Sequence, residues 1–199
     1  MPERNAGKLT GIQAGHPGDP MTDRRTFLAS LAGGTGLFLF GAPGSKPAGR
    51  APSDVALLNV ALELEHTAVF AYGLAAGSGL LSKGALEVGG LFKASHEGHR
   101  TALTQVIKDL KGFPIPARKS YDFSAFELKT EGDVLRLALF LEMKAAHAYQ
   151  QSLAQFRRKA LLEAAGRILG DEVNHAAVLR AALGKGPVAG WGQLDEVGF

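Results

Sequence analysis

The sequence contains no cysteine among its 199 residues. This absence excludes disulfide bonds and every metal site that is built from thiolates. Any metal site in this protein must therefore use histidine, aspartate, glutamate or main-chain oxygen atoms as ligands.

The sequence also lacks a stretch with the period-two alternation of a β-strand. Its apolar run at residues 30–42 is too short and too rich in glycine to favour a membrane span. Hydrophobic residues nevertheless make up 46% of the chain, which is enough for the core of one domain of ordinary size. These features predict an all-α protein.

Residues 51–199 carry no excess of positive or negative charge. Residues 1–50 hold six of the 22 lysines and arginines and three of the 19 acidic residues, which leaves 16 of each sign in residues 51–199. A nucleic-acid-binding domain normally carries a clear basic excess. We therefore expect no nucleic-acid partner for residues 51–199.

The first fifty residues are rich in glycine, proline and alanine and contain Arg24 and Arg25, followed by Phe27 and Leu28. This motif and the short apolar run after it resemble a twin-arginine export signal. The resemblance implies a periplasmic or extracellular protein, with residues 1–50 forming an export signal and a disordered leader.

Three points about this leader stay open. Cleavage after Ala42 or Ala48 is compatible with the sequence, but neither position carries a clean Ala-x-Ala motif. An uncleaved signal would retain the protein at the membrane. Met21 stands directly before the signal, so either Met1 or Met21 is the true start.

The remaining chain predicts four helices. Caps and apolar periodicity favour helices over residues 54–76 and 83–111, a third beginning after Thr130, and a fourth ending near Leu183. The polar residues 155–159 are the expected turn between the last two. Residues 112–130 form a long connection with prolines and phenylalanines, which we expect to pack on the helices.

Two halves of this region resemble each other. Glu65 and Glu142 both follow a Leu-x-Leu triplet, and each is followed seven residues later by a tyrosine. The histidines His99 and His175 lie 34 and 33 positions after these glutamates. Such a near-equal spacing indicates an internal repeat of two helical hairpins.

Polar side chains interrupt the apolar stripe of each predicted helix. Glu172 and His175 are three residues apart, so they share one helix face, and that face is otherwise apolar. Unpaired buried carboxylates are costly, and a metal ion would offset the cost. The candidate metal ligands on the four inward faces are Glu65, His96, His99, Glu142, Glu172 and His175.

This constellation resembles the ferritin-like superfamily, and more narrowly the exported ferritin-like proteins with their desiccation-related relatives. The resemblance covers residues 54–184. It implies an antiparallel four-helix bundle with a long crossover between the second and third helices. It also implies that Glu65 and Glu142 are bridging or terminal carboxylates, that Glu172 and His175 form a terminal pair, and that His99 is the other imidazole.

The sequence departs from the family pattern at position 96, where a histidine replaces the expected glutamate. Glu97 is adjacent but points roughly 100° away around the helix. The resemblance implies a dinuclear iron or manganese centre, while the lost carboxylate leaves zinc, a single metal ion or no metal as alternatives. His96 could also be a core histidine bonded to a carbonyl group.

Other polar residues receive structural interpretations. We expect Glu63 to be exposed, and His66 and His147 to be surface groups or groups that support the metal ligands. Tyr72 and Tyr149 are expected in the core with tethered hydroxyl groups, or as supports of the ligands.

Two hypotheses for the function follow. The first is a di-metal redox enzyme that oxidises Fe(II) or consumes peroxide or oxygen outside the cytoplasm, as a stress protein. The second is a non-catalytic helical bundle that binds metal or a protein partner, and a homodimer is compatible with either. The expected domains are a bundle at residues 51–185 and a tail at residues 186–199.

Overall fold

The computed structural model describes residues 52–186, and the predicted export signal, start sites and most of the tail lie outside them. The described part contains four helices and no strand, as predicted. The helices are α2 (Asp54–Gly77), α3 (Lys83–Asp109), α4 (Glu131–Leu153) and α5 (Lys159–Ala182). The division into leader, bundle and tail stays a prediction.

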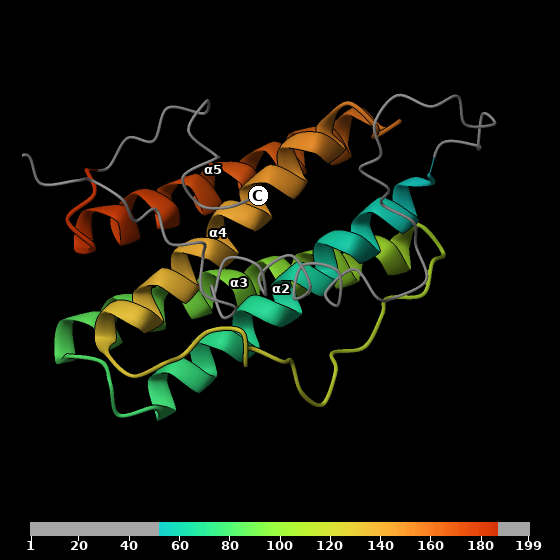
Figure 1. Ribbon diagram of the computed structural model, residues 1–199. Helices are drawn as coiled ribbons and strands as arrows, with labels where there is room; N and C mark the ends of the chain where they lie inside the picture. Colours follow the sequence, from blue (N-terminus) through green and yellow to red (C-terminus); the bar gives the residue numbers. More distant parts are fainter. Residues whose placement is uncertain (1–51, 187–199) are drawn as a thin grey trace, which may run out of the picture.

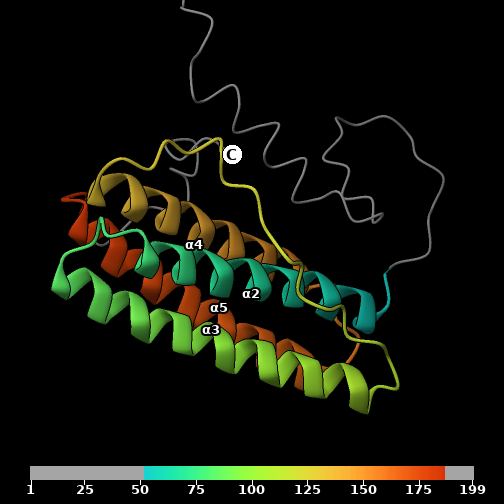
Figure 2. The same cartoon turned by 90° about the horizontal axis from the view of Figure 1, so that it is seen from below.

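The helices form two hairpins, α2 with α3 and α4 with α5, and the hairpins meet mainly through α2 and α4 (Figure 1). The connection from α3 to α4 runs back along the whole bundle, so that α3 and α4 begin at the same end (Figures 1 and 2). One long crossover of this kind is typical of ferritin-like bundles. The predicted fold class is confirmed.

Local capping explains where three helices begin. The side chains of Ser53 and Ser82 accept hydrogen bonds from the backbone N–H groups of Ala56 and Ala85. Thr130 forms a full capping box, in which its own side chain and that of Asp133 each accept a backbone N–H. These caps satisfy N–H groups that have no partner inside the helix, which is why the sequence predicts the starts well.

The other boundaries carry weaker signals. The α5 helix begins after Arg158 without a side-chain cap, although the turn lies in the predicted residues 155–159. The α3 helix ends at Asp109, two residues before the predicted end, and Lys111 takes a left-handed conformation with a φ of 60°. The N–H of Gly112 then bonds to the carbonyl of Ile107, which closes the helix end.

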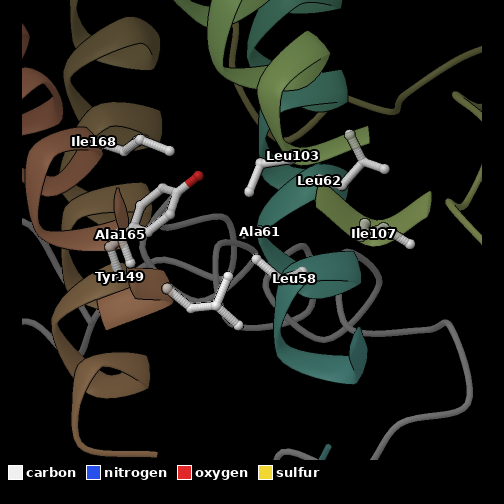
Figure 3. Packing of buried hydrophobic residues seen from close by; sticks show 9 residues of the cluster. Leu58, Ala61, Leu62, Leu103, Ile107, Tyr149, Ala165 and Ile168 are labelled. Carbon is white, nitrogen blue, oxygen red and sulfur yellow. The ribbon is translucent and has the colours of Figure 1, made fainter. Parts of the chain in front are cut away.

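One apolar cluster fills the interior between the two hairpins at the end where α2 begins (Figure 3). Leucine and isoleucine side chains of α2 and α3 face Tyr149 of α4 and the side chains of α5 there. The buried members are Leu58, Ala61, Leu62, Leu103, Ile107, Tyr149, Leu161, Ala165 and Ile168. Tyr72, Phe92, Leu139, Met143, Ala176 and Leu179 form another cluster. The two clusters shield the polar residues from water.

The crossover packs on the bundle, as predicted. Tyr121 and Phe123 are buried against Leu137, Phe140 and Leu141 of α4. These three residues were not predicted to be buried, because the prediction for α4 covered only the face that points into the bundle interior. The crossover therefore gives α4 a second buried face.

Hydrogen bonds and an ion pair hold the crossover against α2. Two residues of α2 that take part, Glu63 and His66, are less exposed than predicted. Glu63 is half-buried rather than exposed, because its Oε1 lies 2.5 Å from Nε of Arg118. His66 is buried rather than at the surface, and its Nε2 lies 3.2 Å from the carbonyl oxygen of Ile115. In contrast, His147 stays partly exposed.

The α2 helix is long and apolar enough to cross a membrane by length and composition. However, 56% of its most apolar stretch is buried inside the bundle. Within residues 52–186, its hydrophobicity is therefore accounted for by its place as a core helix.

Candidate metal centre

All six predicted ligands converge in the bundle interior. Glu65 comes from α2, His96 and His99 from α3, Glu142 from α4, and Glu172 and His175 from α5. Five are buried, and the side chain of His99 keeps 12% of its surface exposed. The structure thus brings the residues together, while their role as metal ligands stays a prediction.

The six residues form two overlapping groups whose ligand atoms lie within 4.8 Å of one another. One group contains Glu65, His96, His99 and Glu172, and the other contains His96, Glu142, Glu172 and His175. The shared residues are His96 and Glu172. Each group could hold a metal ion, and the two groups adjoin because they share these residues.

The imidazole of His96 lies between two carboxylates. Its Nδ1 is 2.8 Å from Oε2 of Glu65, and its Nε2 is 3.1 Å from Oε1 of Glu142. Burial alone would lower the pKa of His96, but the hydrogen bonds to Glu142 and Glu65 raise it to about 11. Without a metal ion, His96 is therefore an imidazolium that donates from both ring nitrogens.

Two tyrosines donate hydrogen bonds to the same pair of carboxylates. The hydroxyl of Tyr149 lies 2.6 Å from Oε1 of Glu65, and the hydroxyl of Tyr72 donates to Oε1 of Glu142. Burial and the adjacent carboxylates raise the pKa of both tyrosines well above the ordinary value. The hydroxyl protons therefore stay in place and fix the orientation of the two glutamates.

Hydrogen bonding also keeps Glu65 and Glu142 ionised. Burial would raise the pKa of Glu65, yet hydrogen bonds from His96 and His99 lower it. Burial has the same effect on Glu142, and hydrogen bonds from His175 and His96 lower the pKa. Two carboxylates are thus kept charged inside the bundle, as metal ligands must be.

Glu172 differs from these two residues. It is fully buried, and neither of its carboxylate oxygens has a hydrogen-bond partner. Its nearest polar neighbours are Nδ1 of His99 at 3.3 Å and Nδ1 of His96 at 3.7 Å. Burial raises the pKa of Glu172 well above the ordinary value. An unpartnered buried carboxyl group is costly, and a cation between the ligands would remove the cost.

His99 connects the centre with the protein surface. Its Nδ1 faces Glu65 and Glu172, while its Nε2 lies 3.2 Å from Oδ2 of Asp171. Burial opposes protonation, but the adjacent carboxylates of Glu172 and Glu65 raise the pKa of His99 to about 10. Asp171 was not among the predicted site residues, although it directly precedes Glu172 in the sequence.

Aromatic rings close the opposite side of the centre. Phe92 of α3 stacks on His175 with the ring centroids 4.1 Å apart, and Tyr72 stacks on His96 at 5.6 Å. Beyond Phe92 and Tyr72 lies a largely apolar pocket of about 260 Å³. The contact of Phe92 with a candidate ligand was not predicted from the sequence.

The residues present fit a metal centre. Three carboxylates and three imidazoles supply oxygen and nitrogen donors of the kind that iron, manganese and zinc accept. Both oxygens of Glu172 are buried and lack hydrogen-bond partners, so they are available to a cation, and Nδ1 of His99 becomes a ligand atom when the ring releases a proton. One Glu from each of two helices and the Glu172–His175 pair of α5 match carboxylate-bridged bundles, whereas α3 carries His96 where that pattern has a glutamate.

Comparisons with known proteins agree with this architecture. A solved structure, that of a conserved hypothetical protein, rv2844, from Mycobacterium tuberculosis, is similar with a TM-score of 0.61 and 21% sequence identity. The similarity covers 68% of this chain and 93% of that chain, and at this identity it supports the fold alone. No curated protein matches this sequence. The family model described as "Ferritin-like domain" matches residues 53–185, so the chain belongs to the ferritin-like domain family.

Proposed function

We propose that this protein is an exported ferritin-like metalloprotein that oxidises Fe(II) with hydrogen peroxide and thereby removes peroxide. The observation that carries the proposal is Glu172, a fully buried carboxyl group without a hydrogen-bond partner between His96 and His99. The overlapping groups of glutamate and histidine around it support two metal positions rather than one.

Each half of the centre would hold one ion. Glu65 and His99 would bind the ion in the first group, and Glu142 and His175 would bind the ion in the second. Glu172 belongs to both groups, so its carboxylate would be shared by the two ions. His96 and His99 can each bind an ion only after one of the two ring protons is released, because an imidazolium has no free lone pair.

Iron or manganese at these positions would supply the electron transfer. Two Fe(II) substrate ions lose one electron each, and hydrogen peroxide accepts both electrons and two protons to become two molecules of water. The residues of the chain prepare the site for this reaction. Tyr72 and Tyr149 keep their hydroxyl protons and hold Glu142 and Glu65 in place, and Phe92 excludes water on one side.

Export of the protein is part of the proposal and is based on the motif at residues 22–29. The twin-arginine route carries folded proteins, so metal insertion would take place before export. Replacing Arg24 and Arg25 by lysine should leave the protein in the cytoplasm. Secretion of this double variant at the normal level would refute the export route without affecting the metal centre.

A specific observation favours a second candidate, a non-catalytic bundle. The imidazole of His96 already bridges Glu65 and Glu142, so it supplies the positive charge that a metal ion would otherwise provide. In this case the protein would act through its surface, as an interaction protein related to stress.

Elemental analysis of the protein from its native compartment tests the proposal, with Glu172→Ala measured beside it. We expect about two transition-metal ions per chain, the number that a dinuclear carboxylate centre holds, and a loss of metal in the variant. Circular dichroism would check that the variant is folded. A folded wild type without metal would refute metal binding and favour the non-catalytic bundle.

Activity requires a separate measurement. Wild-type protein should consume Fe(II) and peroxide in a ratio of two to one, and Glu142→Ala should lose this turnover. A protein that binds metal but shows no Fe(II) oxidation by peroxide would retain the metal centre and refute the proposed reaction.

A further inference from the structure

Of the six residues of the centre, five are buried, and His99 of α3 is partly exposed where it pairs with Asp171 of α5. Among the ion pairs that the six residues form within residues 52–186, one involves an exposed carboxylate, that of Asp171, whose side chain is 52% exposed. Its Oδ2 lies 3.2 Å from Nε2 of His99. Ser95 adds a second oxygen atom, 3.5 Å from the same nitrogen. A polar path of two steps therefore leads from solvent to Glu65 and Glu172.

The opposite side of the centre is unsuited to a cation. There His175 is covered by the ring of Phe92, and the pocket beyond is lined mainly by apolar side chains such as Leu135, Val178 and Leu179. A hydrated ion that entered this pocket would lose water ligands without gaining polar ones, which is costly. The polar side at Asp171 avoids this cost.

We propose that Asp171 and His99 form the entry port of the metal centre, in which Asp171 captures a divalent cation from solvent and His99 passes it to Glu65 and Glu172. This inference rests on the proposed function, because it requires the centre to bind metal. The buried atoms that receive the ion are Nδ1 of His99 and the two oxygens of Glu172, none of which has a hydrogen-bond partner.

The two sets of contacts around His99 fit such a transfer. Nε2 faces the exposed Asp171, whereas Nδ1 lies 3.5 Å from Oε2 of Glu65 and 3.3 Å from Oε1 of Glu172. An ion at Asp171 is thus separated from the buried carboxylates by the width of one imidazole. Negative charge at the mouth of a site also raises the local concentration of cations and their rate of association.

If Asp171 is an entry port, its loss should change the kinetics of metal binding differently than if it only supports His99. A port lowers the barrier in both directions, so its loss slows binding and release together and leaves the affinity unchanged. A residue that only orients His99 stabilises the bound state, and loss of such a support typically weakens metal affinity by about 10–100-fold. The two rate constants therefore distinguish the roles.

Stopped-flow binding of Co²⁺ to the metal-free full-length protein, followed by removal with excess chelator, measures both rate constants. Asp171→Asn keeps an oxygen that can accept the hydrogen bond from His99 but removes the charge. We expect association and release to slow by about tenfold, with the same final amount of bound Co²⁺. Asp171→Glu should restore fast binding.

Glu163→Gln is the matched control, because it removes one exposed carboxylate from α5 that is paired with Lys159 at 3.5 Å. This variant should bind Co²⁺ at the wild-type rate. Unchanged association in Asp171→Asn, or faster release with weaker affinity, would refute the port while leaving the metal centre intact. A wild type that binds no Co²⁺ would refute both the port and the proposed function.

Discussion

The hydroxyl of Tyr149 on α4 donates a hydrogen bond to Oε1 of Glu65 on α2 at a distance of 2.6 Å, across 84 positions of the sequence. The relationship is reciprocal, because Tyr72 on α2 donates to Oε1 of Glu142 on α4. Each half of the internal repeat thus supplies a tyrosine for the glutamate of the other half. This exchange ties the two hairpins together at the centre.

Removing the hydroxyl group of Tyr149 should destabilise the metal-free protein. Tyr149→Phe leaves Oε1 of Glu65 buried without this donor, and the free energy of unfolding should fall by about 1–3 kcal/mol. Urea denaturation measures the change. Tyr121→Phe is the control, because that hydroxyl accepts a 3.3 Å hydrogen bond from the backbone N–H of Arg118 in the crossover. An equal loss in both variants would contradict a special role of the tyrosine at the centre.

Glu172→Gln should separate metal binding from folding. Burial raises the pKa of Glu172, which favours the neutral acid in the metal-free protein, and glutamine resembles this form in shape and charge. The metal-free variant should therefore match the wild type within about 1 kcal/mol.

A thermal melt with Mn²⁺ then tests the binding. At a concentration of 100 times Kd, the metal should stabilise the wild type by about 2.7 kcal/mol and the variant not at all. Equal stabilisation of both proteins would show that Glu172 is not a ligand.

The stability of the metal-free protein should fall as the pH rises from 6.5 to 8. The pKa of His96 is about 11 in the folded protein, against an ordinary value of 6.5 for the unfolded chain, so its stabilising effect is complete below pH 6.5 and is lost as the pH rises toward 11. His99, with a pKa of about 10, acts in the same direction. Each retained proton contributes a slope of at most roughly 1.4 kcal/mol per pH unit.

Thermal melts across this range measure the slope, and His96→Gln should make it shallower whatever its effect on the absolute stability. The range ends at pH 8 because burial lowers the pKa of Lys144 to about 8, which opposes the trend at higher pH. A wild-type stability that rises between pH 6.5 and 8 would contradict a protonated His96.

Asn59→Ala should loosen the crossover. The Asn59 side chain donates to the carbonyl of Phe113 at 3.1 Å and accepts from the N–H of Ile115 at 2.9 Å. Its loss should cost about 1–3 kcal/mol and speed limited proteolysis within residues 113–120. Gln105→Ala, which removes an exposed hydrogen bond to Asp109, should leave the cleavage rate unchanged. Equal cleavage of all three proteins would show that the clamp does not hold the crossover.

The sequence by itself determined the features that depend on local interactions. Ser53, Ser82 and Thr130 define helix starts, because a cap involves only the first turn of its own helix. Helical periodicity also identified the inward faces, and therefore the six residues that the structure brings together.

The tertiary structure decided which side chains contact one another across helices, because these contacts depend on how each helix is rotated and placed against its neighbours. The pairing of Tyr149 with Glu65, the stacking of Phe92 on His175 and the link from Asp171 to His99 all join different helices. The burial of His66 and the pairing of Glu63 likewise required the path of the crossover, which no periodicity in α2 encodes. Local sequence thus specified the faces, and packing specified the partners.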